Sequence, residues 1–158
     1  MKLTITFLIV LSLNFINCKQ KVKVEAKSKD AVSSYTKMDQ VPHLNNNWVA
    51  EMTLNNGTKW EANLETTTGV ADMAKLIGET KTISVEDYRI LGNGLNDLKN
   101  SLVMECTMTG ASHDNLHVFL HPLIQKIELL KKTGSEETGA KIEENIIGHL
   151  KADYIYFD

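Results

Sequence analysis

The sequence predicts an all-α protein, an up-down four-helix bundle that is preceded by a small hairpin or an extended segment. Two observations lead to this prediction. Four segments between residues 67 and 153 carry apolar residues three and four positions apart, which is the period of a helix with one buried face. The breaks between these segments are short, so consecutive helices are expected to pack in antiparallel order.

The segment before the first helix has the pattern of a small hairpin. Residues 48–54 and 58–60 flank Asn56 and Gly57, a favoured two-residue turn because both positions accept positive φ. An isolated hairpin is only marginally stable, so Trp48 and Trp60 are expected to hold this segment against a larger body. A helical start for residues 48–54 is the alternative.

The first two helices are predicted from their ends. Thr67 or Thr68 caps the first helix, and Gly78 ends it. Ser84, with an aspartate three residues later, resembles a capping box and opens the second helix, which Gly110 ends. Two glycines near the beginning of the second helix, at positions 92 and 94, are expected to weaken or bend it.

The last two helices are predicted in the same way. Ser112 caps the third helix, and Pro122 inside it should kink the helix or remove one hydrogen bond. Residues 133–135 break the chain, and a fourth helix follows over residues 136–153. Its inward face is expected to include Tyr154 together with the isoleucines and leucine that precede it.

The first residues have the pattern of an exported protein. A lysine at position 2 precedes an apolar run over residues 3–16 that is too short for a membrane span, and Cys18 follows. This leader resembles those of bacterial lipoproteins, and Phe15 and Asn17 make it similar to the looser lipoboxes of Bacteroidota. The resemblance implies a signal peptide (1–17) and a membrane partner reached through a lipid on Cys18. The polar, lysine-rich composition that follows predicts a flexible tether (18–46), and the helical patterns place the domain over residues 47–158. The implied location is the bacterial cell envelope, facing the periplasm or the surface. Simple secretion with an ordinary Cys18 is the alternative.

Charge and motifs narrow the class of function. Residues 31–158 carry 11 basic and 18 acidic side chains, a balance of −7, which argues against a nucleic-acid partner and is mildly favourable for cations. The motifs of zinc proteases, serine hydrolases and P-loop proteins do not occur in the sequence, and we predict that the protein is not an enzyme. With Cys18 lipidated, Cys106 would have no disulfide partner within the chain.

The candidate site is the stretch from Met104 to His121. His113, His117 and His121 follow one another at intervals of four residues, which places them along one side of a helix. Three sulfur-bearing residues precede them, and a helix hairpin turning near Gly110 would bring these to the same height as the imidazoles. We therefore predict that a metal ion binds among the following residues. They are His113, His117, Cys106, Met104, Met108 and His121.

The predicted ligands also indicate the ion. Thiolate, thioether and imidazole are soft ligands, which favour copper, particularly Cu(I), and then zinc. The predicted function is buffering, sensing or delivery of that ion by a cell-envelope lipoprotein. Two alternatives stay open, namely a four-helix bundle that binds b-type haem through one Met and one His, and a structural or adaptor lipoprotein with an envelope protein as its partner. In the simplest alternative, Cys106 is a buried apolar side chain and the histidines form a polar helix edge.

Overall fold

The computed structural model describes residues 44–158, so the predicted leader, Cys18 and nearly all of the predicted tether lie outside the described residues. Within the described part, the main helices are α1 (Leu64–Glu79), α2 (Val85–Glu105), α3 (Gly110–Lys131) and α4 (Glu136–Leu150). A short 3-10 helix, η2 (Asn47–Glu51), precedes them, and one further helical turn, α5 (Asp153–Tyr156), follows them. No helix between residues 44 and 158 is long and apolar enough to cross a membrane.

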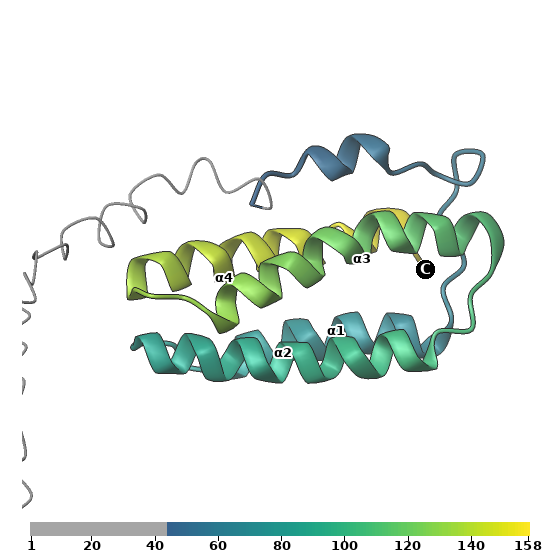
Figure 1. Ribbon diagram of the computed structural model, residues 1–158. Coiled ribbons are helices and arrows are strands. Elements are labelled where there is room, and N and C mark those ends of the chain that lie inside the picture. Colours follow the sequence, from purple (N-terminus) through teal and green to yellow (C-terminus); the bar gives the residue numbers. More distant parts are fainter. Residues whose placement is uncertain (1–43) are drawn as a thin grey trace, which may run out of the picture. The chain divides into compact units, whose positions relative to one another are not determined.

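The four helices form an up-down bundle, which confirms the predicted fold class (Figure 1). α1 lies beside α2, α3 lies beside α4, and the two pairs face each other, while η2 runs along the outer side of α3. Apolar side chains from all four helices fill the interior between the pairs. The most deeply buried of these side chains are Met73, Leu91, Leu95, Leu102, Leu116, Phe119, Leu123, Ile127, Leu130 and Ile146.

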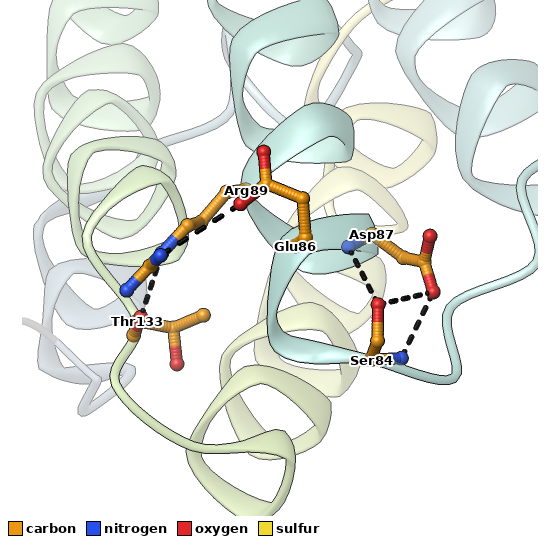
Figure 2. A network of polar contacts seen from close by, with 5 residues as sticks. All are labelled: Ser84, Glu86, Asp87, Arg89 and Thr133. Atoms are coloured by element: carbon orange, nitrogen blue, oxygen red, sulfur yellow. Dashed lines mark hydrogen bonds and ion pairs between the residues drawn. The ribbon is translucent and has the colours of Figure 1, made fainter.

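α2 and α4 begin at the predicted residues because serine caps both. The Ser84 hydroxyl accepts a hydrogen bond from the Asp87 N–H at 3.2 Å, and the Asp87 carboxylate accepts one from the Ser84 N–H at 2.9 Å (Figure 2). These two bonds complete the predicted capping box and satisfy backbone donors that a helix start leaves unpaired. Two residues after Asp87, Arg89 donates to the Thr133 carbonyl at 3.1 Å, which ties the beginning of α2 to the connection that follows α3.

The predicted starts of α1 and α3 are wrong by several residues. α1 begins at Leu64 with Asn63 as its N-cap residue, and the Thr66 hydroxyl donates to the Asn63 side-chain oxygen at 2.5 Å. The threonine run therefore lies inside the helix, where Thr66 is buried. α3 begins at Gly110 rather than after Ser112, whose hydroxyl donates back to a carbonyl in the preceding turn.

The predicted ends of α2 and α4 also need correction. α2 ends at Glu105, and Cys106 is extended, with φ −65° and ψ 120°. The helix therefore stops before Gly110. α4 ends at Leu150, and the chain turns before it forms α5. This turn changes the helix phase, so Tyr154 is 63% exposed and does not face inward as predicted.

The turn of the predicted hairpin is confirmed, whereas its two strands are not present. Asn56 and Gly57 have φ of 52° and 90°, and Asn55 and Thr58 exchange both backbone hydrogen bonds across them. The residues before this turn form η2, which agrees with the helical alternative. After the turn, Trp60 pairs in parallel with Phe157, so the C-terminal residues are joined to the segment that leads into α1.

Gly92 allows α2 to approach the end of α3 very closely. A Cβ atom at position 92 would lie 2.7 Å from the backbone nitrogen of Lys131, which is closer than atoms can pack. The helix runs unbroken through both glycines at its beginning. Gly92 therefore lowers the helix propensity of α2, as predicted, but it is needed where α2 packs against α3. The Lys131 backbone atoms, unlike a flexible side chain, cannot move aside easily.

Substitution of Gly92 by alanine is expected to destabilise the protein, although alanine is the better helix former. Overpacking costs about 1–3 kcal/mol, and the gain in helix propensity offsets about 1 kcal/mol of that loss. Gly148→Ala is the matched control, because no neighbouring atom lies within 4 Å of a Cβ there, and it should stabilise by up to about 1 kcal/mol. Urea unfolding of both variants measures the difference. Equal stabilisation by the two substitutions would contradict the close approach of α2 and α3.

Candidate metal-binding site on α3

The three histidines of α3 lie in contact along one edge of the helix, and we call them the histidine ladder: His113, His117 and His121. His117 and His121 are exposed and His113 is half-buried. The ring centroids of the first pair are 4.4 Å apart and those of the second pair 5.1 Å. The common face that the sequence predicted is therefore present on α3.

His117 uses a different ring nitrogen toward each neighbour. Its Nε2 lies 3.2 Å from Nε2 of His113, and its Nδ1 lies 3.3 Å from Nε2 of His121. Nε2 and Nδ1 of one imidazole ring point in different directions. The three histidines therefore form two pairs and do not converge on one point. In agreement, the described residues contain no group of three or more His, Cys, Asp and Glu side chains arranged around one ion position.

The nitrogen spacing within the ladder fits two ligands of one metal ion. Two nitrogens that each lie about 2.0–2.1 Å from a tetrahedral zinc ion are about 3.3–3.4 Å apart. The 3.2 Å between the Nε2 atoms of His113 and His117 is close to that value. Both Nε2 atoms can bind an ion only when each ring carries its proton on Nδ1. In that tautomer, Nδ1–H of His117 would donate to His121, the kind of contact that orients metal-bound histidines.

The three sulfur-bearing candidates have different surroundings. Met104 is 85% exposed near the end of α2. Cys106 and Met108 are half-buried in the connection between α2 and α3 and pack against the apolar core. The Met108 sulfur lies 3.6 Å from the Thr66 hydroxyl, whose proton is donated to Asn63. The hydrogen bonds of the described residues do not link these sulfur atoms to the ladder, so their part in the site stays a prediction.

A buried polar cluster that the sequence analysis did not single out lies on the other side of α3. The Lys126 ammonium group lies 2.9 Å from Nδ1 of His149, and Nε2 of His149 donates to the Phe119 carbonyl at 2.8 Å. Lys126 also donates to Asn46 at 3.2 Å. The Trp48 ring of η2 stacks on His149 with 4.0 Å between centroids. The cluster therefore attaches η2 to α3 and α4.

Burial sets the protonation of this cluster. His149 is 1% exposed, and burial, with the Lys126 charge added to it, lowers the pKa of His149 to about 3. Burial also lowers the pKa of Lys126 to about 8. His149 is therefore neutral at pH 7, with one nitrogen donating and the other accepting. One signal in the sequence could have revealed the cluster, because Lys126 lies seven residues after Phe119 and four before Leu130 and thus within the apolar stripe of α3.

A further buried ionisable group lies in α5. Asp153 is 5% exposed, and its Oδ1 has no hydrogen-bond partner within the described residues. Burial raises the pKa of this carboxyl group to about 6, although the nearby Lys59 charge acts in the opposite direction. Comparison of the chain with protein-family models, curated proteins and solved structures finds no match.

Proposed function

We propose that this protein is a cell-envelope lipoprotein that binds a transition-metal ion, copper or zinc, through the histidine ladder, for buffering, sensing or delivery. The observation that carries the proposal is the 3.2 Å separation of the two Nε2 atoms of His113 and His117. Imidazole is a ligand that suits both copper and zinc. Because His117 is exposed, an ion bound there would exchange readily with solvent or a partner, which suits transport better than a permanent structural role.

The preference for copper or zinc depends on whether a sulfur atom also binds the ion. A site made only of imidazoles suits zinc and Cu(II), whereas participation of Cys106 or a methionine would favour Cu(I). Cys106 and Met108 lie in the turn that leads directly into α3, so a local rearrangement of residues 106–109 is what would bring them to the ladder. The proposal therefore rests on the imidazoles, and the sulfur ligands are tested separately.

The two alternative functions receive less support from the geometry. A b-type haem needs an imidazole nitrogen that is available inside the bundle. Both ring nitrogens of His149, the buried histidine of the described part, already have hydrogen-bond partners. A structural or adaptor role makes no use of the ladder, and it is the conclusion that failure of the metal experiments would favour.

Metal affinity should depend on two of the three ladder residues most strongly. The His113→Ala/His117→Ala variant loses both nitrogens of the proposed pair, so Zn²⁺ and Cu²⁺ binding should weaken at least a hundredfold, or about 2.7 kcal/mol. His121→Ala should weaken binding roughly tenfold, because it removes only the acceptor of the His117 Nδ1–H. Titration against a competing chelator measures these changes.

Matched controls separate the ladder from the rest of the surface. Gln125 continues the same edge of α3 one turn further and is exposed, so Gln125→Ala should bind metal as the unsubstituted chain does. Cys106→Ser tests the sulfur ligands through a Cu(I) titration, in which a specific loss of Cu(I) affinity would add the thiolate to the site. Unchanged Zn²⁺ and Cu²⁺ binding by the double histidine variant would refute the ladder as the site.

The proposed anchoring has its own test. Cys18→Ser removes the sulfur that a lipid would modify, so the variant should leave the membrane fraction and appear as soluble protein. Cell fractionation followed by mass measurement of the mature chain records both the location and the modification. The lipoprotein assignment would be contradicted if the variant stayed in the membrane fraction and its mass differed from that of the unsubstituted protein only by the exchange of sulfur for oxygen.

A further inference from the structure

We propose that the ion bound by His113 and His117 is shared with the same two residues of a second copy of the chain, so that one zinc ion joins two chains through four imidazoles. This inference rests on the proposed metal function and extends it to the partner of the site. It follows from the number of nitrogens that one chain can direct at one ion. His117 reaches His113 with Nε2 and His121 with Nδ1, so the described residues of one chain direct two ring nitrogens, and not three, at one ion.

Zinc needs more ligands than one ladder supplies. Zinc in proteins usually has four ligands in a tetrahedral arrangement, so two imidazoles from one chain leave two positions to be filled. The described residues place no third His, Cys, Asp or Glu side chain around this pair. A second identical pair, related by a two-fold axis through the ion, would complete a tetrahedral site of four imidazoles. Two-fold dimers are the commonest homo-oligomers, and such an axis requires the same residues from each copy.

Of the two nitrogen pairs in the ladder, the pair formed by His113 and His117 is the better placed to hold an ion that a second chain can reach. Nε2 lies at the far end of the imidazole ring from the backbone, whereas Nδ1 lies next to the carbon that joins the ring to the chain. An ion held by two Nε2 atoms therefore projects farther from α3 than an ion held by Nδ1 of His117 and Nε2 of His121. Greater projection lets a second helix reach the ion without a clash between the two backbones.

The surface around the pair also permits close approach. Within two turns of His117 on either side, Gly110 and Ile124 lie nearest to it in angle, at about 20°. Neither residue carries a charge, and Gly110 has no side chain at all. Glu128 has a similar angle but lies about three turns further along α3, where it pairs with two lysines. The acidic side chain nearest along α3 is that of Asp114, about 60° round from His117. Two copies of this strip can therefore meet without bringing like charges directly together.

The test is the mass of the protein in solution during a zinc titration. The full-length Cys18→Ser chain is used, so that a lipid cannot cause association. Sedimentation velocity at tens of micromolar protein should show a twofold increase in mass as Zn²⁺ is added. The change should be complete at one ion per two chains, and excess chelator should reverse it. His117→Ala should stay monomeric, whereas Gln125→Ala should still form the dimer.

The outcomes distinguish this inference from the function on which it rests. Saturable binding of one zinc ion per chain without a change of mass would overturn the shared site and leave the metal function intact. Dimerisation that His117→Ala does not prevent would also overturn it, because the bridge would then lie elsewhere. Absence of zinc binding would overturn the shared site, and absence of both zinc and copper binding would overturn the metal function as well.

Discussion

Lowering the pH from 7 to about 3 is expected to reduce the free energy of unfolding by as much as roughly 4–5 kcal/mol through His149 alone. The pKa of this imidazole is lowered in the folded protein to about 3 from an ordinary value of 6.5. Between those two values the unfolded chain binds a proton that the folded protein does not. The contribution of His149 is therefore fully present above pH 6.5 and is lost as the pH falls toward 3. Total stabilities of small domains are about 5–15 kcal/mol, so the loss is large.

Asp153 acts in the opposite direction over part of the same range. Burial raises the pKa of its carboxyl group from 3.8 to about 6, so the folded protein binds a proton there more readily than the unfolded chain. Its contribution is present below pH 3.8 and is lost as the pH rises through 6, a difference of roughly 3 kcal/mol. Acidification therefore stabilises the protein through Asp153 while it destabilises the protein through His149.

Two variants separate these contributions. His149→Gln can still donate to the Phe119 carbonyl and accept from Lys126, but it does not titrate, so its stability should fall much less between pH 6.5 and 3. Asp153→Asn removes the opposing contribution and should make the fall in stability steeper. Urea unfolding at several pH values measures both slopes. If His149→Gln and the unsubstituted protein lose stability in parallel, His149 is not the group responsible.

Trp48→Ala is expected to destabilise the protein by about 3–5 kcal/mol, the usual cost of truncating a large buried aromatic side chain. Trp48 is buried, stacks on His149 and meets the edge of Phe119, so its loss removes the main apolar contact of η2. Trp60→Ala is the matched control. Trp60 is half-buried and lies after the turn, so its truncation should cost less.

Trp48→Ala should also change the pH dependence. Without the indole ring, water can reach His149, and its pKa should move back toward the ordinary value, which flattens the acid loss. Thermal and urea unfolding at pH 7 and pH 4 test both consequences. Equal destabilisation by the two tryptophan variants would show that η2 is no more firmly attached than the turn that follows it.

The sequence predicted the bundle well because its strongest signals are local. The capping box of α2, the break before α4 and the apolar stripes could be read directly from the sequence. The start of α1 could not be located, because Asn63 and the threonines after it are all good capping residues. The choice among them depends on the burial of Thr66, which is a property of the packed bundle.

The candidate site was predictable in part for the same reason. The common face of the histidine ladder follows from helix geometry alone, whereas the direction of each imidazole depends on rotamers that the sequence does not specify. The position of the sulfur atoms depends on the path of residues 106–109, which are not helical. The Lys126 cluster was missed because a lysine in an amphipathic helix normally lies at the surface. Its partners come from α4 and from the segment that includes η2, far away in the sequence.

The most direct measurement of the central claim is nitrogen NMR of the imidazole rings during a zinc titration. We expect the Nε2 signals of His113 and His117 to shift strongly as one site fills, while their Nδ1 atoms stay protonated. His149 should be unaffected, because it is buried and both of its nitrogens already have partners. Unchanged Nε2 signals of His113 and His117 in zinc-saturated protein would contradict the assignment of the metal site to the histidine ladder.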